Sequence, residues 1–171
     1  QPIPNGQALG NAWFASAWSM ADGADAEMAA MASLTDSRSA VVPKVFSDAL
    51  SGVVAGAANG GRAKLVSFTP DYQEYQVSAP DKGLLVFSEV HYPEGWQLTI
   101  DGEPAELLRV NYALRGMVVP AGEHTVQMTF AMPSVQSART VASLGSGLLL
   151  LFVFGSLAMA FLGRCTVEEI T

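Results

Sequence analysis

The chain has 171 residues, enough for one ordinary domain or for a smaller domain with an appended segment. Its formal net charge of −7 argues against nucleic acid as a partner, because neutralising phosphates requires clustered Lys and Arg, and it also disfavours docking on anionic lipid. The single cysteine, Cys165, excludes an internal disulfide, so a folded domain must be stabilised by its hydrophobic core.

The N-terminal part of the chain predicts one short helix among less regular segments. Residues Gln1–Gly6 contain no initiator Met, charged n-region or cleavage signature, so we interpret the chain as a fragment of a longer protein. The stretch Ala12–Met20 fits a strand and a helix equally well. Asp22 then has the character of an N-cap, and we expect an amphipathic helix over about Gly23–Leu34. The acidic residues of its first turn suit the helix dipole, and its apolar stripe is expected to fill the core. These residues are Asp25 and Glu27 in the first turn, and Ala24, Met28, Met31 and Leu34 in the stripe.

A short strand and a glycine-rich loop follow the predicted helix. Ser39–Val42 is typical of a strand, and Lys44–Leu50 of a turn or short helix. Ser51–Arg62 contains four glycines and predicts a flexible loop. It lacks the Walker A pattern of a phosphate-binding loop, and strand-like sequence follows it instead of a helix. We therefore expect residues 1–62 to form a mixed α/β segment that packs on the domain that follows.

Residues 63–133 predict an antiparallel β-sandwich that forms one domain with residues 1–62. Apolar and polar residues alternate over short segments, which are separated by turn signals at regular spacing. Asp101-Gly102 suits a tight type I′ hairpin, which needs positive φ at both central residues. The predicted strands are Ala63–Thr69, Tyr72–Ala79, Leu84–Tyr92, Trp96–Asp101, Ala105–Val110, Ala113–Val119 and Glu123–Phe130.

The C-terminal part contains a long uncharged segment. No residue between Arg139 and Arg164 is charged, and Leu148–Phe154 is continuously apolar. A helix of this length would cross the roughly 30 Å of bilayer hydrocarbon. We therefore predict a transmembrane helix over Thr140–Leu162, followed by a tail at residues 163–171. The predicted fold class is mainly β, an antiparallel β-sandwich with a short N-terminal α-helical element, followed by one C-terminal transmembrane α-helix.

The sequence contains no recognisable catalytic motif. It has no G-x-S-x-G pattern of a serine hydrolase. Glu89 and His91 lie two apart on a predicted strand and so share a face, which could supply two metal ligands, but His124 has no ligand spacing with them. We interpret the pair as an exposed polar rim. We therefore expect no catalytic residue, no cofactor and no metal in this chain.

One cluster of aromatic and polar residues is a candidate binding surface. Aromatic rings can stack on the apolar faces of sugars, while Asn, Glu and Arg side chains hydrogen-bond the hydroxyls. The alternative is a packed Trp/Tyr edge of the core in which Arg115 pairs with a local carboxylate. The candidate glycan-contact residues are Glu89, Tyr92, Trp96, Asn111, Tyr112 and Arg115.

Three segments of the chain resemble a known family: Ala8–Ala32 (ALGNAWFASAWSMADGADAEMAAMA), and two later segments that carry its motifs. Leu85–Gly102 reads LVFSEVHYPEGWQLTIDG, and Arg109–Val126 reads RVNYALRGMVVPAGEHTV. Both are similar to the C-terminal part of YfhO-like bacterial membrane proteins, in which a last transmembrane helix follows these motifs. The chain departs from the family pattern at His91, where Tyr is usual, and at Glu94, which is an extra residue.

This resemblance implies a polytopic GT-C type glycosyltransferase that uses a lipid-linked sugar donor. The catalytic carboxylate of such proteins lies in an early loop that this chain does not contain, so the implied role is a non-catalytic extracytoplasmic portion that contacts a glycan acceptor. It implies the bacterial inner membrane as location, with the domain on the periplasmic side and Cys165 in the cytoplasm. The implied partners are membrane lipid, the remaining transmembrane helices of the parent protein and glycan. The alternative is a membrane-tethered β-sandwich module that binds another cell-envelope protein.

Overall fold

The computed structural model describes residues 8–131, 141–156 and 159. The chain divides into two compact units, Gln1–Ala131 and Met132–Thr171. The first unit is β-rich and sandwich-like, as the sequence predicts, and the described part of the second is a helix over residues 141–156 with Met159 also helical.

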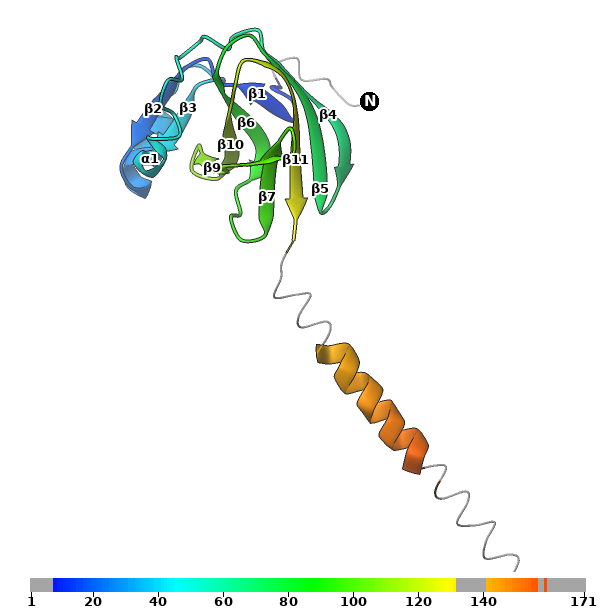
Figure 1. The fold of residues 1–171 in the computed structure, drawn as a ribbon. Coiled ribbons are helices and arrows are strands. Elements are labelled where there is room, and N and C mark those ends of the chain that lie inside the picture. The colour runs from blue at the N-terminus through cyan, green and yellow to red at the C-terminus, as the bar shows by residue number, and fades with distance from the viewer. Residues whose placement is uncertain (1–7, 132–140, 157–158, 160–171) are drawn as a thin grey trace, which may run out of the picture. The chain divides into compact units, whose positions relative to one another are not determined.

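Two antiparallel sheets form the sandwich of the first unit (Figure 1). The four-stranded sheet has the order β1-β6-β10-β9, and the five-stranded sheet has the order β4-β5-β11-β7-β8. Strands β1 and β4 therefore lie at an outer edge of their sheets. The strands of the first sheet are β1 (Ala12–Phe14), β6 (Gly83–Val90), β10 (Leu114–Val119) and β9 (Leu108–Val110), and those of the second are β4 (Arg62–Thr69), β5 (Tyr72–Ala79), β11 (Gly122–Phe130), β7 (Trp96–Ile100) and β8 (Glu103–Ala105).

The main core lies between these two sheets. Phe87 of β6 contacts Tyr75 of β5 edge-on, with 5.0 Å between ring centroids, and both side chains are buried. Alternate residues of each strand point into this layer, because successive side chains of a strand face opposite sides. Further members of this core are Phe14, Val77, Leu85, Leu98, Met117, Val119, Val126 and Met128.

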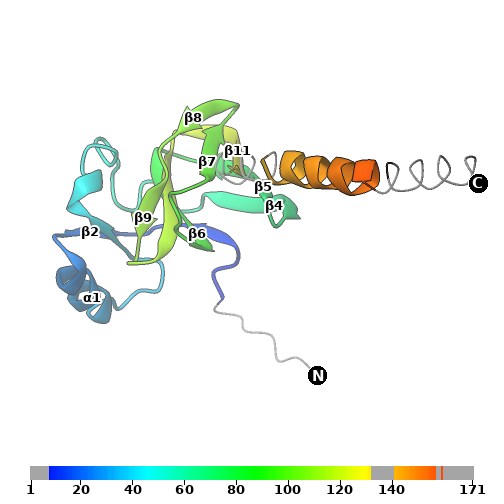
Figure 2. The same cartoon turned by 90° about the horizontal axis from the view of Figure 1, so that it is seen from below.

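A third layer covers the other face of the four-stranded sheet. It contains β2 (Trp18–Ala21), which pairs in parallel with β3 (Ala40–Pro43), the helix α1 (Ala24–Ala32) and the 3-10 turn η1 (Lys44–Phe46). In both views α1 lies beside β2 (Figure 1, Figure 2). A second buried cluster joins this layer to the sheet, so β6 is covered on both faces. This explains why the run Leu84–Phe87 of β6 is continuously apolar and does not alternate. The cluster includes Ala40, Val42, Leu50, Val53, Leu84, Val86, Leu108 and Val110.

The helix α1 forms where the sequence predicts it, but its buried face is different. Its N-cap is Gly23, whose φ of 88° and missing side chain give no capping hydrogen bond, so the predicted cap at Asp22 is wrong. Met28 is 53% exposed, so the methionine does not fill the core. The buried side chain is Glu27, whose carboxylate accepts a hydrogen bond of 2.6 Å from Arg109 of β9. An ion pair therefore fastens α1 to the sheet.

The chain between β7 and β9 makes one tight turn and then crosses from one sheet to the other. Asp101 and Gly102 have φ of 52° and 87°, which confirms the predicted type I′ geometry between β7 and β8. The segment predicted as one strand over Ala105–Val110 is divided into β8 and β9, which belong to different sheets. The predicted continuous strand is therefore wrong, because the chain crosses from one layer to the other at this point.

The predicted transmembrane helix is not supported by the structure. Among residues 8–131, 141–156 and 159, no helix is both long and apolar enough to cross a bilayer. The described helix covers residues 141–156, whereas a bilayer-spanning helix needs roughly 20 residues. The fold class as predicted is therefore wrong in its transmembrane part. The predicted tail at residues 163–171, with Cys165, lies outside the described residues.

Candidate functional site

Arg115, one of the predicted glycan-contact residues, is part of the interior. It is only 4% exposed, and its Nε donates a hydrogen bond of 2.9 Å to the carbonyl of Val90. Its guanidinium lies 4.0 Å from the centroid of the Trp96 ring, close enough for a strong cation–π contact. Trp96 in turn packs against Phe130, with 5.3 Å between ring centroids. Arg115 thus braces the end of the core between the sheets.

Glu89 belongs to the same cluster through its charge. Burial raises the pKa of Tyr75 to about 12, and the negative charge of Glu89 adds to this shift. Burial also lowers the pKa of Arg115, while Glu89 opposes that change. Glu89 thus offsets part of the cost of burying the guanidinium, although the two form no ion pair within 4.0 Å among the described residues. Arg115 and Trp96 thus pack together as the packed-edge alternative expects, but the ion pair of Arg115 with a carboxylate that it also expects does not occur among the described residues.

The other three predicted residues lie on two turns. Asn111 has a φ of 49°, and its Oδ1 accepts a hydrogen bond of 2.7 Å from the backbone N–H of Val41, which ties the β9–β10 turn to the third layer. Tyr112, 43% exposed, lies under the guanidinium of Arg109 at 5.6 Å. Tyr92, also 43% exposed, follows β6. The side chains of Arg115 and Asn111 thus make their contacts on opposite faces of the four-stranded sheet. Glycan binding by these residues stays a prediction, for which the two tyrosines provide exposed rings.

The predicted absence of a metal site concerns Glu89 and His91. No group of three or more metal-ligating side chains occurs among the residues that the structure describes. The pKa of His91 is lowered, mainly by burial and then by the positive charge of Arg109. Its backbone N–H donates to the carbonyl of Ala113, so this segment continues the pairing of β6 with β10.

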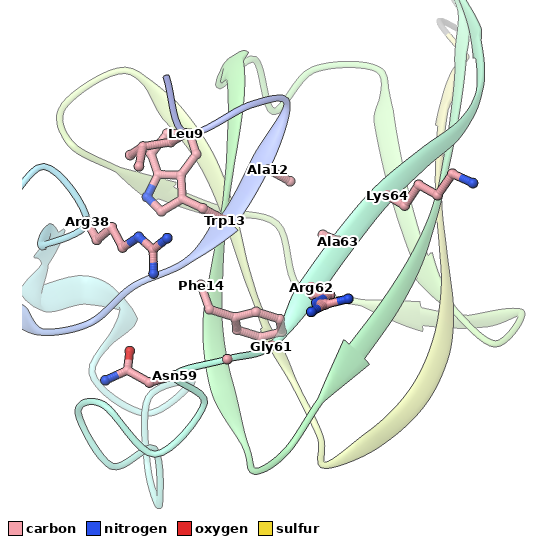
Figure 3. A pocket seen from close by; sticks show the side chains of 11 residues that line it. Leu9, Ala12, Trp13, Phe14, Arg38, Asn59, Gly61, Arg62, Ala63 and Lys64 are labelled. Carbon is pink, nitrogen blue, oxygen red and sulfur yellow. The ribbon is translucent and has the colours of Figure 1, made fainter. Parts of the chain in front are cut away.

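A cleft that sequence reasoning missed lies at the side of the sandwich where β1 and β4 are neighbours (Figure 3). Its volume is about 380 Å³. We call it the β1–β4 cleft. Because the two strands belong to different sheets and each is an edge strand, the cleft opens between the layers of the sandwich. Its lining residues are Leu9, Ala12, Trp13, Phe14, Arg38, Asn59, Gly60, Gly61, Arg62, Ala63 and Lys64.

Small residues and one aromatic ring shape this cleft. Phe14 points from β1 toward Gly61, which directly precedes β4 (Figure 3), and it is only 5% exposed. A Cβ at Gly61 would lie 2.5 Å from the Phe14 ring carbon Cδ2, so only glycine lets the chain pass so close. Ala12 and Ala63 leave space between the strands because their side chains are short. Phe14 belongs to the main core, so the floor of the cleft is anchored.

The cleft is positively charged although the chain is acidic. Its charged lining residues are Arg38, Arg62 and Lys64, and none of the described lining residues is a carboxylate. Arg62 and Lys64 are exposed and make no ion pair within the part of the chain that the structure describes. Arg38 is partly compensated: Asp36 has a lowered pKa, held first by a hydrogen bond from Ser16 and also by the Arg38 backbone and charge. In a chain of net charge −7, this is a local reversal of sign.

Trp13 adds an indole to the same cleft. Its side chain points toward Arg38 (Figure 3). Its Nε1 is buried and has no hydrogen-bond partner among the described residues. A buried donor without an acceptor costs free energy, so an acceptor that reached this N–H would be stabilised.

Only a weak signal in the sequence could have indicated this site. Arg62 and Lys64 alternate with Ala63 directly after Gly60-Gly61, but the glycines led to a loop prediction for the first part of this stretch. Arg38 comes from a distant segment and reaches the cleft only through the fold. Comparisons with family models, with curated proteins and with solved structures found no match for this chain. The resemblance to YfhO-like proteins therefore stays an expectation that depends on the sequence motifs alone.

Proposed function

We propose that this chain is a non-catalytic binding module that holds an anionic ligand in the β1–β4 cleft. The observation that carries the proposal is the concentration of Arg38, Arg62 and Lys64 around one cleft in an acidic chain. Exposed cations without carboxylate partners attract an anion at long range and keep their full charge for it. An indole beside them offers an apolar surface.

The lining of the cleft favours binding over catalysis. Its polar side chains are those of Trp13, Arg38, Asn59, Arg62 and Lys64, none of which abstracts a proton or attacks a substrate at neutral pH without a strongly shifted pKa. General base and nucleophilic groups such as carboxylate, imidazole, hydroxyl or thiol do not occur among the described lining residues. Both functions that the sequence leaves open are non-catalytic, and a binding cleft is compatible with either of them.

Titration with two anionic probes of different backbone tests this proposal. The probes are an oligogalacturonide and the acetylated, amidated peptide (Thr-Glu)3, and Trp13 provides a fluorescence signal inside the cleft. The full chain is used in a neutral detergent, since residues 141–156 expose apolar side chains. We expect saturable binding of at least one probe that weakens as salt is added.

A charge-matched pair of variants locates the binding. Arg62→Gln with Lys64→Gln should weaken binding about 5- to 30-fold, if each exposed charge contact contributes about 0.5–1 kcal/mol. The control, Lys44→Gln with Lys82→Gln, removes the same charge outside the cleft, where Lys44 pairs with Asp22 and Lys82 donates to a backbone carbonyl. Binding of neither probe, or an equal loss in both variants, would refute the proposal.

A further inference from the structure

The outer edge of β4 is an unpaired strand edge beside the positively charged cleft. On one side β4 pairs with β5, and no described strand pairs with the other side. The backbone N–H and C=O groups along such an edge form a template on which another extended chain can add as a strand. The cleft begins at this edge, because Arg62, Ala63 and Lys64 of β4 line it.

The arrangement of the cations favours an extended ligand over a compact one. Arg62 and Lys64 are two residues apart on a strand, so they share a side at a spacing of about 6.6 Å. Arg38 and Lys64 lie at opposite ends of the cleft and do not converge on one point (Figure 3). A single phosphate or carboxylate would meet one cation at a time, whereas a chain with an acid at every second residue would meet them in register.

Resting on the proposed function, we propose that the ligand is an extended acidic peptide that adds to the outer edge of β4, with alternate carboxylates on Arg62 and Lys64. Main-chain hydrogen bonds to β4 hold the peptide, and the charge pairs select its side chains. Acidic sugars present carboxylates as well, but they cannot repeat the N–H and C=O spacing of a strand edge.

A bulge in β4 limits where the peptide adds. The register against β5 shifts between Leu65 and Ser67, so the regular edge covers Arg62–Leu65. Bulges and edge lysines are devices by which proteins avoid pairing with their own copies. Here two β4 edges would bring cation against cation, while an acidic strand gains from the same charges. The edge is thus closed to self-association and open to a partner of opposite charge.

Exposed apolar side chains lie at the bulge and beyond it. Val66 is 54% exposed and Phe68 is 59% exposed. They give the partner an apolar contact next to its acidic segment, so the preferred peptide carries apolar residues on one flank of its acidic residues. Phe68→Ser should weaken the binding of such a peptide and leave the binding of the purely acidic (Thr-Glu)3 unchanged.

Backbone methylation of the probe separates strand addition from simple charge attraction. Two versions of (Thr-Glu)3 carry N-methyl groups on all Thr or on all Glu residues, so both keep the charges of the parent. Only every second N–H of an added strand faces its neighbour. One version should therefore bind about 10-fold more weakly than the parent, or worse, while the other should keep most of the affinity.

The outcomes distinguish this inference from the proposed function. If both methylated versions bind as well as the parent, the cleft attracts anions but β4 does not accept a strand, and the inference fails alone. If the oligogalacturonide binds and no peptide does, the inference also fails and the ligand is a glycan. If neither probe binds, the proposed function fails with it.

Discussion

The ion pair between α1 and β9 has one buried and one partly exposed partner, which predicts an asymmetric response to substitution. The side chain of Glu27 is 1% exposed, whereas that of Arg109 is 32% exposed and also donates to the carbonyl of Tyr112 at 2.9 Å. Arg109→Gln leaves a buried carboxylate without its cation and should cost about 3–5 kcal/mol. Glu27→Gln leaves a guanidinium that reaches water and keeps its carbonyl acceptor, so it should cost only about 1–2 kcal/mol.

Urea unfolding of the full chain in neutral detergent, followed by tryptophan fluorescence, measures both values from the midpoint and slope. The double variant is the internal control, because removing both charges should restore part of the stability lost in Arg109→Gln alone. An equal loss in the two single variants, or a larger loss for Glu27→Gln, would show that the pair acts as an exposed contact and would refute the reasoning.

Three other features give predictions of their own. Hydrogen bonding to Asp101 raises the pKa of His124, and the same bond lowers the pKa of Asp101. Their pairing should therefore stabilise the fold fully at pH values between the ordinary pKa of Asp and the ordinary pKa of His. This contribution should be lost as pH rises through the raised pKa of His124. His124→Gln should therefore flatten the fall in unfolding free energy between pH 6 and pH 8, which denaturation at a series of pH values measures, and an unchanged slope would contradict the assignment. Gly61→Ala should destabilise the chain by about 1–3 kcal/mol and move the Phe14 ring, because the new Cβ would lie 2.5 Å from that ring; a melting temperature equal to that of the unsubstituted chain would exclude the close approach. Asn111→Ala should cost about 1–3 kcal/mol by losing the bond to the β3 backbone and placing Ala at a φ of 49°. Asn111→Gly also loses the hydrogen bond, but glycine adopts this φ without strain, so it should cost less stability than Asn111→Ala. A larger loss for Asn111→Gly than for Asn111→Ala in urea titrations would contradict this account.

The strands of the sandwich could be predicted because their signals are local. The alternation in Tyr72–Ala79 and the turn at Asp101-Gly102 each arise from a few neighbouring residues, and the structure confirms both. The strand predicted over Leu84–Tyr92 is likewise found, as β6, and the third layer explains why its first residues are apolar on both faces. In each case the sequence neighbours decide the conformation, so no knowledge of distant contacts is needed.

Features that depend on distant contacts could not be predicted. The buried residue of α1 is Glu27 because its partner, Arg109, is 82 residues away along the chain. The helical pattern of apolar residues predicts that a glutamate faces solvent and that the methionines face the core. The candidate site shows the same effect, since Arg38 lies before β3 and Arg62 on β4, and only the fold brings these distant segments to one cleft.

The candidate glycan residues were partly predictable as a cluster. Trp96 and Arg115 do lie together, and the alternative of a packed aromatic edge describes them well. The face of the sheet on which these two side chains lie could not be predicted, because a change of one residue in strand register moves a side chain to the other face. A register shift between Leu114 and Arg115 occurs at this point of the β10–β6 pairing.

Mapping the binding site by nuclear magnetic resonance tests the central claim most directly. The full chain, labelled with ¹⁵N in neutral detergent, is titrated with each anionic probe, and the changes in amide and indole resonances are assigned to residues. An anionic ligand in the β1–β4 cleft predicts the largest changes at the Arg62–Leu65 amides and at the indole N–H of Trp13. Changes centred on Tyr92 and Tyr112, with the cleft resonances unmoved, would contradict the proposal and return the binding surface to the residues that the sequence suggested.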